Sequence, residues 1–376
     1  MGGEEGGGVV GRLAPSPTGV LHLGNVRTFM MAWLAVRSAG GRMILRVEDL
    51  EKPLTGTILE DMLSDLSWLG FDWDEGPVWT GAEDETLVEI RRFPRARALA
   101  AGRARDLVVP DRDGWASAIG RLLPYAGGQG PYIQSRRTAW YNRVFGSMCE
   151  AGLIYPCTCE RAEYAGMLGA PHEGDAEPRY PGTCRDRWPS VEAAREWLGR
   201  QEAAGAGFSN APVRRNREPV WRFRVPDDGS ARVEFRDAIH GICRIDVSAT
   251  VGDFVVFKSP GLPAYQLAVV ADDLAMGVTQ VVRGDDLISS TARQILLWKA
   301  LEALGLAGVG SGALASGRPG LPEYAHVPLV VGPDGARLAK RHGDARLRTF
   351  RDQGGDPCNL IGRLAAWSGL GDGSPC

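Results

Sequence analysis

The chain has 376 residues, of which 44% are hydrophobic and 24% are charged, and its formal net charge is −3. This ordinary globular composition is long enough for two or three domains and excludes a chain with a global basic field for nucleic acid. No apolar run approaches the roughly 20 residues of a membrane span. We therefore expect no membrane partner, and nothing in the sequence demands a dimer rather than a monomer.

The seven cysteines are an odd number, and three of them cluster at Cys157, Cys159 and Cys184. An odd and clustered set favours a reduced, cytoplasmic protein with a metal site over a disulfide framework. Residues 1–8 are rich in Gly and Glu. We interpret them as a flexible acidic tail and not as a signal peptide.

The first predicted elements alternate between strands and helices. Residues 9–13 and 42–47 have the apolar runs of buried strands, and residues 26–38 and 57–69 have the apolar stripe of amphipathic helices. A strand–helix–strand–helix order predicts parallel strands joined by crossovers, which is the arrangement of a doubly wound sheet.

The middle of the chain changes character. Residues 81–130 are rich in Arg, Ala and Asp with Pro and Gly breaks, and we interpret them as a surface insertion. Residues 137–151 are predicted to be helical, and the alternation over 220–257 predicts a small antiparallel sheet. The remaining predicted elements are strands at 264–270 and 279–283 and a helix at 291–304.

The most informative segment follows the first strand and runs Ala14-Pro-Ser-Pro-Thr-Gly-Val-Leu-His22-Leu-Gly-Asn25. A Pro/Gly turn at the carboxyl end of a strand lets the backbone approach a nucleotide, and an imidazole there can hydrogen-bond phosphate. Far downstream, a Gly-flanked basic loop carries Lys340 and Arg341. Taken alone, such a loop is more often a solvated surface. Together with the turn and His22, it predicts phosphate chemistry on ATP.

With these motifs the chain resembles the class I aminoacyl-tRNA synthetases of the glutamyl type. The segment from Ala14 to Asn25 matches the first signature of that family, and Arg337-Leu-Ala-Lys340-Arg341 stands at its second, lysine-bearing signature. Tyr265-Gln-Leu-Ala-Val-Val-Ala-Asp-Asp273 and Val282-Arg-Gly-Asp-Asp-Leu287 follow the family between them. The resemblance covers residues 10–68 and 130–342. It implies an α/β fold with a Rossmann-like doubly wound parallel sheet.

The resemblance also implies a site for free L-glutamate. Its residues would be Arg12, Ala14, Ser16, Glu48, Tyr265 and Arg283. The chemistry fits, because two guanidinium groups suit two carboxylates and the Glu48 carboxylate suits the α-ammonium group. The alternative for Arg283 is a salt bridge with Asp285 or Asp286, and the alternative for Glu48 is an ordinary strand-end carboxylate.

ATP, with Mg²⁺ held mainly by its phosphates, is the second substrate that the resemblance implies. The residues expected to contact it are Thr18, His22, Asn25, Lys340 and Arg341. The chain departs from the family pattern at three places. Asn25 replaces the second signature His, Ala339 replaces the usual Ser before the lysine, and residues 50–54 lack the usual Asp-x-x-Arg. These departures bear on rate and local packing and not on the class of reaction.

Cys157-Thr-Cys159 and Cys184 have the spacing of a structural zinc site, to which a fourth ligand must be added. His172 and Tyr180 lie nearby, and the chemistry of zinc favours the imidazole. The resemblance to glutamyl-Q tRNA(Asp) synthetases, which combine C-x-C with Y-x-x-x-C, favours Tyr180. It implies one structural Zn²⁺ per chain. The alternative is a set of reduced, buried thiols without metal.

Only residues 344–376 follow Gly343, where full glutamyl-tRNA synthetases continue with an anticodon-binding region. This short form resembles glutamyl-Q tRNA(Asp) synthetase. The resemblance implies activation of L-glutamate without tRNA and transfer to the queuosine base in the anticodon stem-loop of tRNA(Asp). Arg136-Arg137 and Arg214-Arg215 are candidates for phosphate contacts, and the alternative for each is a solvated surface. The alternatives are a shortened glutamyl-tRNA synthetase that charges tRNA(Glu), and an inactive paralogue that acts as an RNA-binding module.

The expected organisation follows from these assignments. It comprises a disordered tail (1–8), a first Rossmann half (9–148), an α+β zinc-containing connective module (149–260), a second Rossmann half with the lysine loop (261–343) and a short helical C-terminal segment (344–376).

Overall fold

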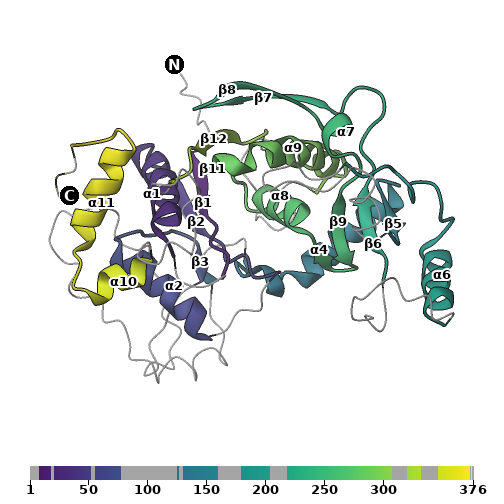
Figure 1. Cartoon of the computed structure of the whole chain (residues 1–376), viewed down its shortest axis with the longest axis horizontal. Helices are drawn as coiled ribbons and strands as arrows, with labels where there is room; N and C mark the ends of the chain where they lie inside the picture. Colours follow the sequence, from purple (N-terminus) through teal and green to yellow (C-terminus); the bar gives the residue numbers. More distant parts are fainter. Residues whose placement is uncertain are drawn as a thin grey trace, which may run out of the picture.

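The computed structural model describes residues 8–17, 21–51, 56–77, 125–126, 130–159, 179–203, 218–306, 320–331, 346–372 and 374. Figure 1 shows an elongated arrangement, with α1, α2, α10 and α11 at one end and β5, β6, β9 and α6 at the other. The strands β1, β2, β11 and β12 lie beside α1, and helices α8 and α9 occupy the middle.

The first crossover unit forms as the sequence predicts. Its elements are β1 (Val10–Leu13), α1 (Leu23–Ser38), β2 (Arg42–Leu45), α2 (Gly56–Trp68) and β3 (Gly76–Pro77). Strands β1 and β2 pair in parallel, with Val10 opposite Arg42. Helix α1 packs closely against β1 at Gly11. A Cβ at this position would lie 2.3 Å from Cγ2 of Val36, so only glycine, which has no Cβ, fits there.

A second set of strands forms a four-stranded sheet in the order β11-β12-β7-β8. Its elements are β7 (Arg232–Asp237), β8 (Gly241–Asp246), β11 (Gln280–Gly284), η5 (Asp285–Leu287), α9 (Ile288–Ala303) and β12 (Glu323–Val327). Strand β11 pairs in parallel with β12, and β12 pairs in parallel with β7 at Tyr324 and Asp237. Strands β7 and β8 form an antiparallel hairpin. The Thr279 amide donates to the Val10 carbonyl at 2.8 Å, which ties β1 to the start of β11.

The third set of strands is antiparallel and lies toward the other end of the molecule (Figure 1). Its strands are β5 (Ile154–Cys157), β6 (Val220–Phe223), β9 (Val255–Ser259) and β10 (Leu262–Pro263), and the helices η3 (Gln134–Arg136), α4 (Thr138–Glu150) and α6 (Val191–Ala203) belong to the same part of the chain. The short helix α7 (Val247–Thr250) follows β8, and β4 (Tyr125–Ala126) pairs with β3 in a separate two-stranded sheet. The prediction of one small sheet over 220–257 is therefore wrong. Strands β6 and β9 join β5 and β10, whereas β7 and β8 extend the sheet of β11 and β12. Alternation predicts strands but not their partners.

Helix α8 (Tyr265–Ala275) corrects a second prediction, since residues 264–270 were expected to form a strand. Every residue from Leu267 to Ala275 in this helix is buried. A helix that is apolar all round has no polar face, so its periodicity does not distinguish it from a buried strand. The outcome matters for function, because α8 begins at Tyr265 and ends with two buried carboxylates, Asp272 and Asp273.

The C-terminal segment is helical, as expected, with α10 (Leu347–Asp352) and α11 (Pro357–Trp367). The Asp356 side chain caps α11 by accepting from the Asn359 amide, and Pro357 occupies its first turn. Arg348 pairs with Asp61 at 2.7 Å, and Arg27 donates to Ser368 at 2.9 Å. These contacts hold the C-terminal helices against α2 and α1.

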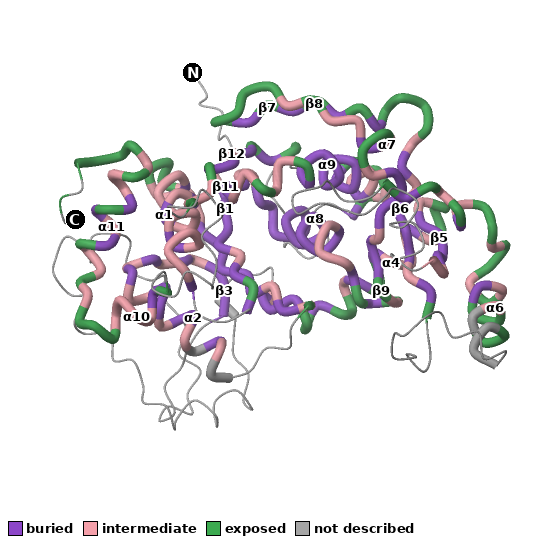
Figure 2. The backbone as a smooth tube through the Cα atoms, viewed as in Figure 1, coloured by how far each residue is buried: buried purple, intermediate pink, exposed green. Residues whose placement is uncertain are grey.

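Burial is continuous through the middle of the molecule, where α8, α9 and the central strands are mostly buried (Figure 2). Several buried side chains there are charged, among them Arg12, Arg46, Asp272, Asp273 and Arg283. Such charges are stable in a core only when they are paired or reserved for a ligand. Within the described ranges, no helix is long and apolar enough to cross a membrane.

Candidate active site

The carboxyl ends of β1 and β2 bring the first predicted site residues together. Arg12 lies in β1 and Glu48 follows β2, and the Glu48 amide donates to the Pro15 carbonyl at 3.0 Å. Because the strands are parallel, these ends meet at one edge of the sheet, where open α/β sheets bind ligands. Ala14 is half-buried and Ser16 is exposed on the segment that leaves β1.

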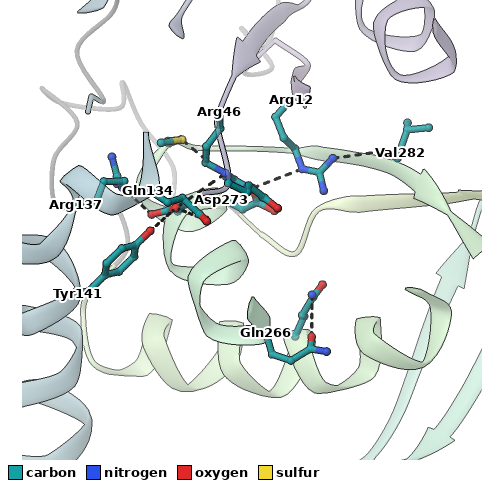
Figure 3. Close-up of polar contacts among 12 residues, drawn as sticks. Arg12, Arg46, Gln134, Arg137, Tyr141, Gln266, Asp273 and Val282 are labelled. Atoms are coloured by element: carbon teal, nitrogen blue, oxygen red, sulfur yellow. Dashed lines mark hydrogen bonds and ion pairs between the residues drawn. The ribbon is translucent and has the colours of Figure 1, made fainter. Parts of the chain in front are cut away.

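A buried charge network lies beneath this edge (Figure 3). Arg46 donates to Asp273 at 2.6 Å and to Glu48 at 3.0 Å, and Arg12 pairs with Asp273 at 3.6 Å. Burial would lower the pKa of Arg46, but the carboxylates of Asp273, Glu48 and Asp272 raise it above its ordinary value. Sequence reasoning assigned no role to this network, although two adjacent acids inside an apolar run were a visible signal.

Arg283 extends from β11 into the same region. Its Nε donates to Nε2 of His326 at 3.1 Å and its Nη2 donates to Thr291 Oγ1 at 2.7 Å, whereas its Nη1 is buried without a hydrogen-bond partner. The partners of Arg283 are therefore not the carboxylates of Asp285 and Asp286 that the alternative required. Burial lowers the pKa of Arg283.

Contacts link the predicted glutamate ligands. Arg12 Nη1 donates to the carbonyl of Val282, the residue before Arg283, at 3.4 Å, and the Arg46–Asp273 pair joins Arg12 to Glu48. Burial and the charge of Glu48 raise the pKa of Tyr265, while the charges of Arg283 and Arg12 act in the opposite direction. Burial also raises the pKa of Glu48, against the charges of Arg46 and Arg12. The site therefore contains two guanidinium groups, one carboxylate and one phenol on four different elements or loops.

The expected ATP residues are only partly within the described chain. His22 caps α1, and its Nδ1 accepts from the Asn25 amide at 3.4 Å. Thr18, Lys340 and Arg341 lie outside the described residues, as do positions 81–124 and 127–129 of the expected insertion. The described residue that follows the lysine segment, Arg346, forms a β-bridge with His22. The preceding flank is also close, since a Cβ on Gly24 would lie 4.0 Å from Val330 Cβ.

A cavity of about 260 Å³ opens beside Tyr265. Among its lining residues are Glu51, Lys258, Gln266 and Tyr180. The cavity thus lies between the candidate glutamate ligands and the cysteine cluster. Its walls carry both charges and aromatic surface.

The cysteine cluster is compact. The Sγ atoms of Cys157, Cys159 and Cys184 lie within 4.8 Å of one another. The Tyr180 hydroxyl is 3.4 Å from Cys157 Sγ and 3.6 Å from Cys159 Sγ, and it accepts from the Cys184 amide at 2.9 Å. His172, the other candidate ligand, lies outside the described residues.

One predicted nucleic-acid contact is corrected. Arg137 is buried, pairs with Asp272 at 2.7 Å and donates to the Pro131 carbonyl, so its guanidinium cannot bind an external phosphate. Its neighbour Arg136 is exposed, and Arg214-Arg215 lie outside the described residues. The Arg-Arg pattern did not distinguish the two environments, because the partner of Arg137 is far away in the sequence.

Comparison with known proteins defines the class of protein. The model of the family "tRNA synthetases class I (E and Q), catalytic domain" matches residues 8–100 and 111–368. The chain therefore belongs to this family of class I aminoacyl-tRNA synthetases, which are ligases. A glutamate-tRNA synthetase from Elizabethkingia anophelis has the same fold, with a TM-score of 0.61 and 24% identity, over 95% of this chain and 61% of that chain.

The chain is similar to members of two groups within this family. The glutamyl-Q tRNA(Asp) synthetase of Symbiobacterium thermophilum is 39% identical over 96% of this chain and 87% of its own length. That of Nitratidesulfovibrio vulgaris is 38% identical over 96% of this chain and 86% of its own length. Glutamate–tRNA ligase 1 of Acidithiobacillus ferrooxidans is 33% identical over 95% of this chain, but the match spans only 57% of that protein.

Proposed function

We propose that this chain activates L-glutamate with ATP and then transfers it to the queuosine base of tRNA(Asp). The observation that carries the proposal is the proximity of Arg12, Glu48, Tyr265 and Arg283, in a chain whose similar relatives bear the name glutamyl-Q tRNA(Asp) synthetase. Arg12 contacts the Val282 carbonyl beside Arg283, and it shares the Arg46–Asp273 network with Glu48. A site with two guanidinium groups and one carboxylate matches the charges of glutamate.

The chemistry of recognition follows from these groups. Arg12 and Arg283 bind the carboxylates, Glu48 binds the α-ammonium group, and the Tyr265 hydroxyl orients it. Ala14 and Ser16 supply the backbone and hydroxyl beside the ligand. Glutamine is rejected, because an amide donor that faces a guanidinium group leaves buried polar atoms unpaired.

Activation requires attack by the α-carboxylate of glutamate on the α-phosphorus of ATP, with pyrophosphate as the leaving group. We assign the phosphates to the amino end of α1, with Thr18, His22 and Asn25, and to Lys340 and Arg341. The described flanks support this assignment, because Arg346 bridges His22 and Val330 lies near Gly24. Mg²⁺ enters with ATP.

Lys340→Ala is expected to slow the exchange of pyrophosphate into ATP at least 100-fold, with little change in the affinity for glutamate.

The proposed acceptor of the glutamyl group, the queuosine base of tRNA(Asp), distinguishes this proposal from the charging of tRNA(Glu). The cavity beside Tyr265, lined by Lys258 and Glu51, offers a place for a base next to the bound glutamate. We assign the anticodon stem-loop of tRNA(Asp) to this side of the molecule. The rival is the charging of tRNA(Glu), which the similarity to glutamate–tRNA ligases supports.

Exchange of pyrophosphate into ATP tests the first half of the proposal. Glutamate-dependent exchange without tRNA is expected, and the absence of exchange would leave an RNA-binding module. Charging of queuosine-containing tRNA(Asp) tests the second half, with tRNA(Asp) lacking queuosine as the matched control. Charging of tRNA(Glu) instead would establish the rival.

We also propose that Cys157, Cys159, Cys184 and Tyr180 hold one structural Zn²⁺. A tetrahedral ion with Zn–S bonds of about 2.3 Å needs sulfur atoms roughly 3.8 Å apart, and Cys159 Sγ lies 3.5 Å from Cys184 Sγ. When bound, the ion crosslinks the loop after β5 to the segment before α6. Metal analysis should find about one zinc per chain in the purified protein and about none in Cys184→Ser.

A further inference from the structure

A buried histidine stands directly behind Arg283, outside the set of residues assigned to glutamate. His326 lies in β12, between β11, which carries Arg283, and β7, which carries Asp237. Its side chain is fully buried, and so is that of Asp237. A buried imidazole between a guanidinium group and a carboxylate is either a structural link or a device that orients the guanidinium group.

Hydrogen-bond logic fixes the state of this imidazole. Arg283 is always protonated, so its Nε must donate to Nε2 of His326 at 3.1 Å, and Nε2 is therefore the unprotonated nitrogen. The Thr291 hydroxyl, 3.0 Å from the same Nε2, can then act toward it only as a donor. Nδ1 then carries the proton and donates to Asp237 Oδ2 at 2.6 Å. Burial and the charge of Arg283 lower the pKa of His326, against the pull of Asp237, which agrees with a neutral ring.

Asp237 is itself locked in place. Its Oδ1 accepts from the amides of Ile239 and His240, both at 2.9 Å, and its Oδ2 accepts from the His326 amide at 3.1 Å as well as from the ring. Every one of these partners is a donor, so the site requires a carboxylate with acceptors on both oxygens. The chain turn after β7 thereby fixes the tautomer of the histidine in β12.

The result for Arg283 is a guanidinium group held at two of its nitrogen atoms by neutral acceptors. Nε is bound by His326 and Nη2 by Thr291, which leaves Nη1 buried and without a hydrogen-bond partner. We infer that His326, fixed by Asp237 and assisted by Thr291, is a positioning residue that aims Nη1 of Arg283 at a carboxylate of the amino-acid substrate. This inference rests on the proposed function.

A matched pair of substitutions separates positioning from packing. In His326→Asn the amide reaches Asp237 but leaves Arg283 Nε without an acceptor, whereas in His326→Gln the longer side chain offers an acceptor near Nε. We expect the Asn variant to raise the glutamate KM in pyrophosphate exchange about 10-fold or more and the Gln variant about threefold or less. The ATP KM should stay within about twofold in both.

Two further variants complete the series. Thr291→Val removes both the acceptor of Arg283 Nη2 and the hydroxyl contact with His326 Nε2, with a side chain of similar shape, and it should raise the glutamate KM several-fold with the ATP KM unchanged. His240→Ala is the control, because it removes only the ring that contacts the His326 carbonyl at 3.0 Å and keeps the amide that donates to Asp237, so both KM values should stay unchanged. Equal effects of Asn and Gln at 326, or a parallel rise of both KM values, would overturn the inference.

A measurement on the unmodified protein makes the test independent of how well the variants fold. In ¹⁵N spectra of protein labelled at its five histidines, one ring should be the neutral tautomer protonated at Nδ1 and should resist protonation on mild acidification. A His326 ring that is cationic or protonated at Nε2 contradicts the inference. If pyrophosphate exchange by the wild-type protein does not depend on glutamate, the proposed function is wrong. The spectrum would still test the His326 contact separately.

Discussion

Arg46 and Arg283 are both buried guanidinium groups near the candidate site, yet their surroundings are opposite. Arg46 is surrounded by the carboxylates of Glu48, Asp272 and Asp273, whereas the hydrogen-bond partners of Arg283 are a neutral histidine and a hydroxyl. The carboxylates raise the pKa of Arg46 against the effect of burial, and burial lowers that of Arg283. The fold compensates the charge of Arg46 with carboxylates, whereas no carboxylate is a hydrogen-bond partner of Arg283, which agrees with its proposed role in binding an anionic ligand.

The largest expected effect comes from removing the compensated cation. Arg46→Met leaves three carboxylates in the interior without their common partner. We expect the free energy of unfolding to fall by about 3–5 kcal/mol, as measured for broken buried ion pairs. Denaturant unfolding followed by circular dichroism measures this change. Unaltered stability would mean that Arg46 is not what neutralises this cluster.

The uncompensated cation should behave in the opposite way. Arg283→Met removes a charge whose hydrogen-bond partners are neutral, so the stability of the apoprotein should be unchanged or raised. The glutamate KM in exchange should rise about 100-fold, because a desolvated charge-assisted contact is lost. A variant that is strongly destabilised but still binds glutamate normally would reverse the assignment of the two arginines.

Glu48 contacts Arg46 and is also a proposed ligand of glutamate. Its titration should therefore affect glutamate binding, by less than the loss of Arg283 does. Burial raises the pKa of Glu48, so it takes up a proton at higher pH than an exposed glutamate with a pKa of about 4.3. Protonated Glu48 cannot attract the α-ammonium group. The glutamate KM should therefore rise as the pH falls, by at most about tenfold per pH unit, while the ATP KM changes less.

Glu48→Gln is the matched control for this titration, since it carries no charge at any pH. Its glutamate KM should be high throughout and should not follow the wild-type pH dependence. A wild-type profile that is retained in Glu48→Gln would assign the titration to another group.

The residues that lie on contiguous motifs could be predicted from the sequence, and those that depend on distant pairing could not. Arg12, Glu48, Tyr265 and Arg283 were named from motifs, and the structure brings them together, whereas their roles in binding glutamate remain predictions. Helix α8 was predicted as a strand because its apolar residues surround it on every side. Without a polar face, the hydrophobic periodicity of the sequence could not distinguish this helix from a buried strand.

The supporting residues illustrate the other case. Arg46 is 227 positions from Asp273, and Asp237 is 89 positions from His326. Nothing local in either side chain identifies its partner, because the contacts depend on strand order and register. The same reason explains Arg137, which was expected at the surface and is instead bound to Asp272. Lys340, Arg341 and Thr18 lie outside the described residues, so their roles stay predictions.

Helix α8 connects features that are otherwise separate. Tyr265 stands at its first turn, and at its last turn Asp272 accepts from Gln134, Arg137 and Tyr141. The helix therefore joins Tyr265, which we propose as a ligand of the amino acid, to the contacts with η3 and α4 at its other end. If Tyr265 has the proposed role, substitutions in η3 and α4 that displace α8 are expected to change the preference for the amino acid without any contact with it.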